Sequence, residues 1–168
     1  MNNIILIGFM GSGKSSFGRF LGRKGYRFTD TDDMIVEREH TSINDIFAAH
    51  GEEYFRDLET KVITELVESG ERGLVVSVGG GLPVRECNRK LLRRLGKVIY
   101  LRADIKTLVN RLSGDSNRPL LKGGNLTDRI STLMRERKSI YEDAADIILD
   151  TDNKTFDRMY NEIRKALK

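Results

Sequence analysis

The chain contains, near its amino terminus, the stretch Gly8-Phe9-Met10-Gly11-Ser12-Gly13-Lys14-Ser15. It has the G-x-x-x-x-G-K-S spacing of a nucleotide phosphate-binding loop. An apolar run at residues 4–7 precedes it and a helix-forming stretch follows it, which is the strand–loop–helix setting that this motif requires. The stretch therefore predicts a site for the phosphates of a nucleoside triphosphate.

Each residue type in this loop has a physical role. Glycines let the backbone turn tightly and point successive N–H groups at an anion, and the following helix adds its unpaired N–H groups and the positive end of its dipole. Lys14 can reach the β- and γ-phosphates, and the Ser15 hydroxyl can bind Mg²⁺. The nucleotide-binding residues predicted here are Gly11, Ser12, Gly13, Lys14, Ser15 and Ser16.

Composition narrows the class of protein. A length of 168 residues suits a single domain with a proper core, and 39% hydrophobic with 32% charged residues suits a soluble globular enzyme. The net charge of +4 comes without any basic run, so we expect no nucleic-acid partner.

Cys87 is the only cysteine, which excludes an internal disulfide and fits a reducing compartment. No leader and no stretch of about 20 apolar residues is present, so we expect a cytoplasmic monomer without membrane contact.

Predicted strands and helices alternate along the whole chain, which is typical of an α/β fold with a parallel sheet. The predicted strands lie at residues 4–7, 26–28, 74–78, 98–101 and 147–149. The predicted helices lie at residues 14–23, 34–39, 42–49, 52–69, 84–95, 104–112, 127–144 and 155–167. This order predicts a three-layer α/β/α sandwich around a five-stranded parallel sheet, with ligands at the carboxyl ends of the strands. Phe47, Tyr54 and Phe55 are expected in the core.

The stretch from residue 113 to 125 lacks apolar periodicity and is rich in Gly, Asp, Ser and Asn. A structureless segment of this length inside a compact domain is often functional, so it is predicted to be a mobile lid. It carries Arg118. A mobile arginine close to a γ-phosphate can neutralise charge in the transition state.

Two acidic residues, Asp30 and Asp32, follow the second predicted strand. In an extended stretch this spacing points both carboxylates in the same direction. One could hold Mg²⁺, directly or through water, while the other meets a substrate hydroxyl as orienter or base. The simpler interpretation is that acidic residues cap the next helix, for which Asp33 would suffice. The residues alone leave both interpretations open.

Three consecutive glycines, Gly79, Gly80 and Gly81, follow the central strand. Their backbone-entropy cost makes an ordinary turn a poor explanation, and they permit close approach of a ligand to bare backbone. Two further arginines, Arg56 on the long helix and Arg137 on the charged helix, are candidates for binding an anionic substrate, although single arginines are most often solvated surface residues.

Together these motifs closely resemble the shikimate kinase family. The matching segments, which occur in the family's order and near its spacing, are residues 8–15, 28–32, 51–56, 76–81, 118–121 and 137–141. The phosphate loop alone is unspecific, whereas the combined series Asp-Thr-Asp, Phe-Arg, Gly-Gly-Gly and Arg-Pro-Leu-Leu is highly specific. The resemblance covers essentially the whole chain and implies a P-loop kinase fold in one domain, residues 1–168, with an acceptor-binding helical segment at residues 32–60.

The resemblance also implies the activity and the substrates. The γ-phosphate of ATP would pass, with Mg²⁺ bound, to the 3-hydroxyl of shikimate. Lys14, Asp32 and Arg118 would be the catalytic residues, and Arg111 and Arg118 would join the loop in binding ATP. Asp30 would lie near the metal together with Ser15. Ser77 matches the position that reaches the metal through water.

For the acceptor, the resemblance implies that Asp32 binds the shikimate hydroxyls and that Arg56 and Arg137 hold its carboxylate, while Gly79, Gly80 and Gly81 line the pocket. Forked guanidinium groups are well suited to a small carboxylate. The family often places a proline against the adenine after the last strand. Here that region is residues 150–156, with Phe156 as a candidate wall.

Other functions agree less well with the sequence. A GTP-driven switch would need aspartate where Phe156 follows Asn153-Lys154-Thr155, and no D-x-x-G motif occurs. A nucleic-acid-dependent ATPase is disfavoured by the small size and the lack of a basic stripe. A kinase for gluconate or a nucleotide is the nearest alternative, but two arginines beside a glycine triplet suit a compact carboxylate better.

Overall fold

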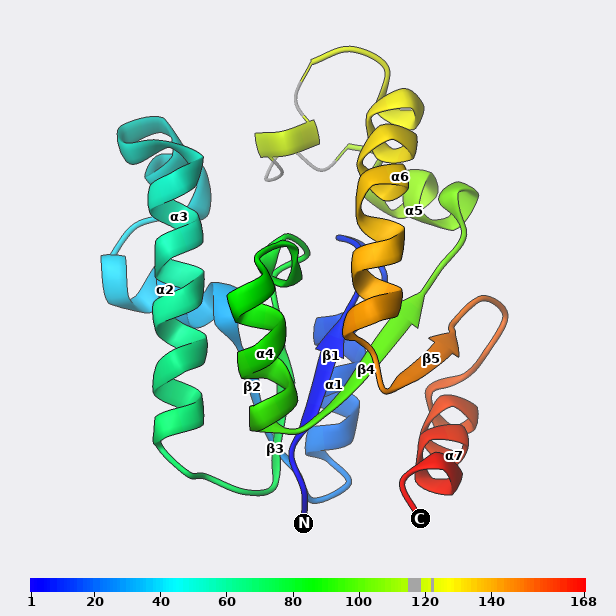
Figure 1. The fold of residues 1–168 in the computed structure, drawn as a ribbon. Coiled ribbons are helices and arrows are strands. Elements are labelled where there is room, and N and C mark those ends of the chain that lie inside the picture. Colours follow the sequence, from blue (N-terminus) through cyan, green and yellow to red (C-terminus); the bar gives the residue numbers. More distant parts are fainter. Residues whose placement is uncertain (115–118, 122) are drawn as a thin grey trace.

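The computed structural model describes residues 1–114, 119–121 and 123–168. Its centre is one sheet of five parallel strands in the order β2-β3-β1-β4-β5 (Figure 1). The strands are β1 (Ile4–Ile7), β2 (Arg27–Asp30), β3 (Leu74–Ser77), β4 (Lys97–Arg102) and β5 (Ile147–Asp150). The predicted α/β class and the five parallel strands are confirmed, and the second strand extends two residues further than expected.

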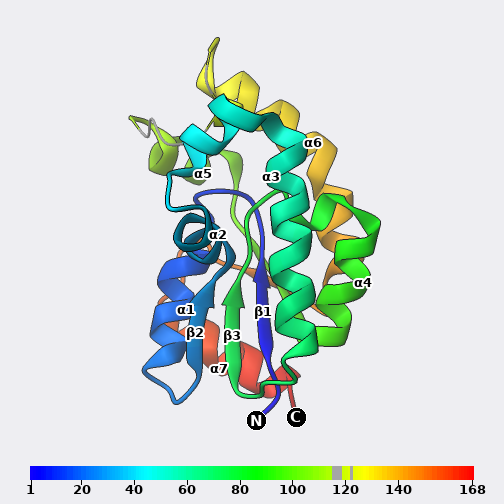
Figure 2. The same cartoon turned by 90° about the vertical axis from the view of Figure 1, so that its left-hand side faces the viewer.

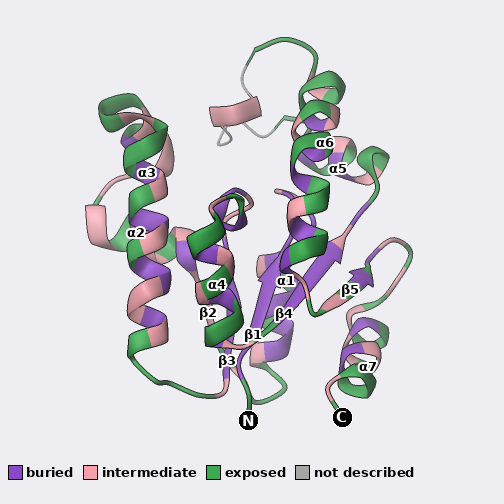
Figure 3. Ribbon diagram, viewed as in Figure 1, coloured by how far each residue is buried: buried purple, intermediate pink, exposed green. Residues whose placement is uncertain are grey.

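Helices cover both faces of the sheet because side chains alternate along each strand. On β1, Ile4 and Leu6 pack into one core with α1 (Lys14–Gly22) and α7 (Phe156–Ala166). Ile5 and Ile7 pack into the other core, which also includes Ile35, Leu108 and Leu112 and is covered mainly by three helices. These are α3 (Ile43–Glu68), α4 (Glu86–Leu95) and α6 (Leu126–Ala144). Figure 2 shows the resulting three layers, and Figure 3 shows the buried residues concentrated on the strands and on the inward sides of the helices.

The topological switch point of the sheet, where the chain connections leave neighbouring strands toward opposite faces, lies between β1 and β3. The helix after β1 belongs to one face and α4, after β3, belongs to the other. In open α/β sheets such a switch point leaves a crevice outside the carboxyl ends of the strands. Both the phosphate loop and the glycine triplet follow these two strands, so the fold brings them to one crevice.

Helix ends follow sequence signals closely. Ser42 caps α3, Asp104 caps α5 (Ile105–Leu112) and Thr155 caps α7, each accepting a hydrogen bond from a backbone N–H three residues on. The cap of α2 (Thr31–Glu39) is Asp30, whose side chain accepts from the Asp32 N–H, and not Asp33 as the simpler interpretation supposed. Asp32 therefore lies in a first helical turn and not in an extended stretch.

Four other details differ from the sequence-based expectations. The two helices predicted around Gly51 form the single element α3, which Gly51 interrupts with φ 82 and ψ 178. Residues Leu82–Val84 form a short 3-10 helix, so α4 begins at Glu86. Pro119–Leu121 forms a second 3-10 helix inside the segment expected to be structureless. Tyr54, expected in the core, is 36% exposed because it lies on the outer side of α3.

Within the described ranges, no helix is long and apolar enough to span a lipid bilayer.

Candidate functional site

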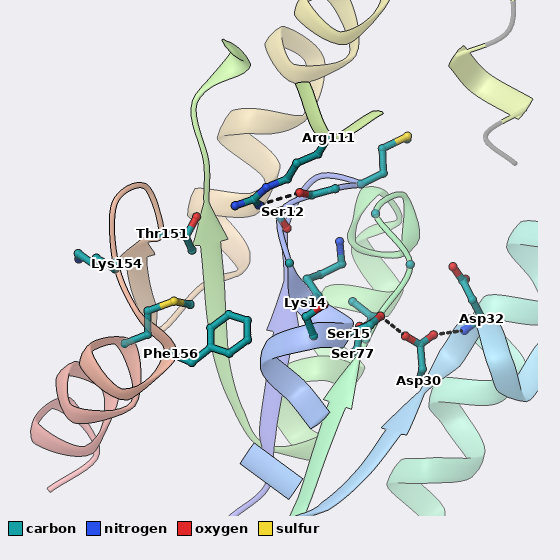
Figure 4. Close-up of a pocket in the computed structure, with 18 residues that line it drawn as sticks. Ser12, Lys14, Ser15, Asp30, Asp32, Ser77, Arg111, Thr151, Lys154 and Phe156 are labelled. Carbon is teal, nitrogen blue, oxygen red and sulfur yellow. Dashed lines mark hydrogen bonds between the residues drawn. The ribbon is translucent and has the colours of Figure 1, made fainter. Parts of the chain in front are cut away.

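The larger of two adjoining pockets lies over the carboxyl ends of the central strands and has a volume of about 480 Å³. Figure 4 shows its side chains. The loop residues, both aspartates and two of the glycines line it together with groups from the end of the chain. Its lining includes Gly11, Ser12, Gly13, Lys14, Ser15, Ser16, Asp30, Asp32, Ser77, Gly79, Gly80 and Arg111.

The phosphate loop has the conformation that the motif requires. Gly11 and Gly13 have φ values of 79 and 96, in the left-handed region that favours glycine. Gly13 is the N-cap of α1 and supplies no side-chain cap, so the first N–H groups of the helix point into the pocket. The Lys14 ammonium donates to the carbonyl oxygens of Gly8 and Phe9 at 2.8 and 2.9 Å, which holds this buried cation at the centre of the loop.

Three oxygen-bearing side chains gather beside the loop. The Ser15 hydroxyl donates to Asp30 Oδ2 at 2.6 Å and lies 3.4 Å from the Ser77 hydroxyl (Figure 4). A hydroxyl and a carboxylate next to a phosphate site form the sparse oxygen ligand set that Mg²⁺ accepts, since this ion keeps several waters and takes further oxygens from substrate phosphates. The donor set thus fits the predicted metal.

A second pocket, of about 80 Å³, adjoins the first and shares Met10, Asp32, Gly79 and Gly80 with it. The remaining lining comes from α3, from the residues after β3, from α6 and from the described part of the 113–125 segment. These residues are Ile43, Phe47, Phe55, Arg56, Glu59, Gly81, Pro119, Leu120 and Arg137. Arg56 and Arg137 therefore meet in one small pocket, although they lie on different helices.

The glycine triplet is required by the close packing of charged groups around it. A Cβ at Gly79 would lie 2.6 Å from Glu59 Oε2 and 2.9 Å from Asp32 Oδ1. A Cβ at Gly81 would overlap the guanidinium group of Arg56, and one at Gly80 would lie 3.3 Å from the backbone nitrogen of Met10. Side chains at Gly79 and Gly81 would displace charges that line the smaller pocket, and one at Gly80 would press on the backbone of the phosphate loop.

The charged side chains of the smaller pocket are shielded from solvent, and two of them are hydrogen-bonded to each other. Arg56 donates to Glu59 at 2.5 Å and to Glu52 at 3.2 Å, and the Glu59 side chain is fully buried. Burial raises the pKa of the Glu59 carboxyl from its ordinary 4.5 to about 7, with Asp32 adding to the rise while Arg56 and Arg137 oppose it. Arg137 is 5% exposed, and its Nη1 has no hydrogen-bond partner among the described residues. A buried guanidinium with a donor to spare is suited to an anion.

Sequence reasoning missed three residues that support this pocket. Glu59 is one, and its signal was a charged residue on the apolar side of α3, one turn after Phe55. Thr31 is buried and accepts from the Gly79 N–H at 3.1 Å. The Tyr141 hydroxyl donates to the Gly80 carbonyl at 2.5 Å, and burial raises its pKa to about 12. Thr31 on α2 and Tyr141 on α6 thus hold the backbone of the glycine triplet from two different helices.

Arg111 borders the far end of the larger pocket and donates to the Gly11 carbonyl at 2.9 Å (Figure 4). Thr151, Lys154, Phe156 and Met159 line the same pocket from the end of the chain. The Phe156 ring packs against Phe17 and Phe20 with centroids 5.6 and 5.5 Å apart, so this residue is also part of the core below.

The structure brings together all the predicted site residues that it describes, in these two pockets. Arg118, predicted to be catalytic and to bind ATP, lies outside the described residues.

Comparisons with known proteins agree with this arrangement. The model of the shikimate kinase family matches residues 10–168. The shikimate kinase of Geobacter sulfurreducens is 46% identical over 96% of this chain and 88% of its own length. That of Geobacter metallireducens is 45% identical over 100% of this chain and 93% of its own length.

Solved structures give the same result. The shikimate kinase from Acinetobacter baumannii, determined in complex with shikimate, superposes with a TM-score of 0.93 at 32% identity over 99% of this chain and 93% of that one. The enzyme from Aquifex aeolicus has a TM-score of 0.83 at 36% identity, over 98% of this chain and 95% of its own. With a family model that matches nearly its full length and relatives above 40% identity, this chain belongs to the shikimate kinase family.

Proposed function

We propose that this chain transfers the γ-phosphate of ATP to the 3-hydroxyl of shikimate. The observation that carries the proposal is the shared wall of the two pockets. Asp32, Gly79 and Gly80 border both the phosphate loop and the small pocket that contains Arg56 and Arg137. A donor phosphate and a small carboxylate bound on the two sides would meet at Asp32.

On the donor side, the backbone N–H groups of the loop and the Lys14 ammonium bind the phosphates. Ser15 would hold Mg²⁺ directly, and Asp30, which accepts a hydrogen bond from Ser15, would hold it through water. When bound, Mg²⁺ would neutralise charge on the phosphate oxygens. Arg111, fixed to the Gly11 carbonyl, lies against the adenine.

On the acceptor side, Arg56 and Arg137 bind the shikimate carboxylate, and the backbone of Gly79–Gly81 contacts the ring. Asp32 hydrogen-bonds the hydroxyls and accepts the proton of the attacking one as its oxygen bonds to the γ-phosphorus, while the bond from that phosphorus to the β–γ bridging oxygen breaks and ADP leaves. Most of the catalysis comes from placing the two substrates in line and neutralising charge between them.

Several parts of this proposal concern the whole domain. Residues 1–168 act as a single kinase domain, with the segment at 32–60 binding the acceptor. The segment at 113–125 acts as a lid that excludes water, and its Arg118 closes over the phosphates. The enzyme works as a cytoplasmic monomer and needs no nucleic acid or membrane.

The test is ADP release with ATP and Mg²⁺ in the presence of shikimate, gluconate or nucleoside monophosphates as acceptors. We expect turnover with shikimate and a background rate with the others, and mass spectrometry should identify shikimate 3-phosphate. Chelation with EDTA should remove the activity, and added Mg²⁺ should restore it. Turnover only with gluconate or a nucleotide would overturn the proposal.

A further inference from the structure

Two separate parts of the chain border the far end of the larger pocket. One is α5, which carries Arg111, and the other is the segment at 151–156 that joins β5 to α7. Thr151, Lys154 and Phe156 contribute the pocket lining from this segment, which we call the 151–156 loop. A flat base bound between them would need a gap of fixed width.

A single carboxylate connects the two parts. Asp152 Oδ2 accepts from the backbone N–H of Asp104 at 2.9 Å, and Asp152 Oδ1 accepts from the Thr107 hydroxyl at 2.9 Å. Asp104 is the N-cap of α5 and Thr107 lies in its first turn. Both carboxylate oxygens of one loop residue are therefore bonded to the start of the helix that carries Arg111.

The loop is shaped so that this carboxylate reaches α5. Thr151 is anchored on β4 through its N–H and its hydroxyl, which donate to the Arg102 carbonyl at 2.9 and 3.2 Å. Asn153 takes a left-handed conformation with φ 57, and the Lys154 N–H closes the turn on the Thr151 carbonyl at 3.3 Å. Asp152 lies at the tip of a turn that is fixed on both sides.

We propose that Asp152 is a positioning residue for the nucleotide base, which sets the separation between Arg111 on α5 and the 151–156 loop. The inference rests on the proposed function, because it takes ATP as the ligand of the larger pocket. Asp152 itself does not line the pocket, so it acts through the two walls that it joins. Its removal should weaken nucleotide binding and leave acceptor binding and the chemical step unchanged.

The alternative is that Asp152 only stabilises the start of α5, and Asp104 allows the two roles to be separated. Asp104 caps the same helix by accepting from the Thr107 N–H at 2.7 Å, and among the described residues its side chain forms no hydrogen bond or ion pair with the loop. The Asp104→Ala variant keeps the backbone N–H that binds Asp152. It therefore loses the helix cap while the connection between the walls remains.

The experiment compares Asp152→Ala with Asp104→Ala by measuring KM for ATP, KM for shikimate, kcat, the Kd of ADP and the melting temperature. Loss of two hydrogen bonds that fix one wall should raise KM for ATP and the Kd of ADP about tenfold in Asp152→Ala, with kcat and the KM for shikimate within about twofold. Asp104→Ala should melt at a lower temperature and bind ADP as the wild type does. The Thr107→Val variant, which loses one of the two bonds, should fall between them.

Equal ADP affinity in Asp152→Ala and the wild type would overturn the inference, as would the same loss of ADP affinity in Asp104→Ala. A parallel fall of kcat and both KM values with melting temperature would show a purely structural role and would also overturn it. Failure of the proposed function is distinct, because the wild-type chain would then show no shikimate-dependent ADP release at all.

Discussion

The donor half of the site, which we propose binds ATP, and the acceptor half, which we propose binds shikimate, use different kinds of chemical group. The donor half is mainly backbone, since a glycine loop and the first turn of α1 present N–H groups around a central lysine. The acceptor half is mainly side chain, since Glu59 and Arg137 are buried and Arg56 is nearly so, and these charges on α3 and α6 balance one another. The phosphate-binding part of the donor half is thus encoded in eight consecutive residues, whereas the acceptor half exists only when separate helices pack together.

The difference has an energetic consequence. Backbone donors at a helix start remain in place when a neighbouring side chain changes. Buried charges do not behave this way, because removing one partner leaves another charge uncompensated in a low-dielectric environment. Substitutions in the acceptor half should therefore affect binding, protonation and stability together, and those in the donor half should be more local.

The largest effect is expected at Asp32, the charged residue that borders both pockets. Asp32→Asn keeps the shape of the side chain but removes the proton acceptor and hydroxyl orienter. Loss of a positioned general base lowers rates roughly 10²- to 10⁴-fold, and we expect a fall of that size in kcat. Steady-state kinetics should show KM for ATP within about twofold of the wild type, since the phosphate loop is unaltered.

The neighbouring Asp33 provides the control for this substitution. It lies one residue further along α2, does not line either pocket, and is not the cap of the helix. Asp33→Asn should retain most of the activity. If Asp32→Asn folds normally and keeps a near-normal kcat, Asp32 has no catalytic role, whichever substrate it contacts.

Much of the fold and of the donor half could be predicted because their signals are local. The alternation of apolar runs and amphipathic stretches gave five strands in their right places, and the Ser42, Asp104 and Thr155 caps act within three residues. The boundaries that were wrong depend on backbone details, such as the 3-10 turn at Leu82–Val84. A local pattern cannot decide between a 3-10 and an α-helical first turn.

The acceptor half could not be predicted from residue types alone, because its residues come together only through tertiary packing. Arg56 and Arg137 looked like ordinary surface arginines, and only the packing of α3 and α6 around the glycine triplet buries them together. Glu59 depends on the same packing, because its burial comes from elements distant in the sequence. The resemblance to a family supplied the arginine roles and included Tyr141 in a matching segment, but it assigned Tyr141 no role, and neither it nor the spacing indicated Glu59.

The second prediction separates the halves by comparing one arginine from each. Arg137→Ala should raise KM for shikimate by roughly 30- to 150-fold, since a buried charged hydrogen bond is worth about 2–3 kcal/mol, while KM for ATP stays within about twofold. Arg111→Ala should raise KM for ATP by about tenfold, a smaller effect because Arg111 is exposed and its proposed contact with the base would be partly in solvent, and leave shikimate binding unchanged.

Two results would contradict this separation. One is a rise of both KM values in either variant, and the other is an unchanged KM for shikimate in Arg137→Ala. Arg135→Ala is the matched control, because Arg135 is exposed on the same helix two residues earlier. It should leave both KM values unchanged, and its melting temperature should show the cost of losing an arginine from the surface of α6.

The smallest effect concerns the protonation of Glu59. With a pKa of about 7, this carboxyl changes charge near neutral pH, and its ionised form would compete with the proposed acceptor carboxylate for Arg56. We therefore expect KM for shikimate to rise by about three- to tenfold between pH 6 and pH 8 in the wild type, since two units span the titration. In Glu59→Gln, which keeps an acceptor oxygen for Arg56 but cannot ionise, KM for shikimate should stay nearly level, and KM for ATP should be flat in both proteins.

Fold stability gives an independent measure of the same titration. Glu59 has its raised pKa of about 7 only in the folded chain, so between its ordinary 4.5 and 7 the folded state binds more protons than the unfolded state. The contribution of Glu59 to the free energy of unfolding is then greatest below pH 4.5, falls as pH rises to about 7, and is level above that, with a total of about 3 kcal/mol. Urea unfolding of Glu59→Gln should lack this fall. If the two proteins show the same dependence on pH, Glu59 does not titrate near neutrality, and any change in acceptor binding has to come from another group in the acceptor half.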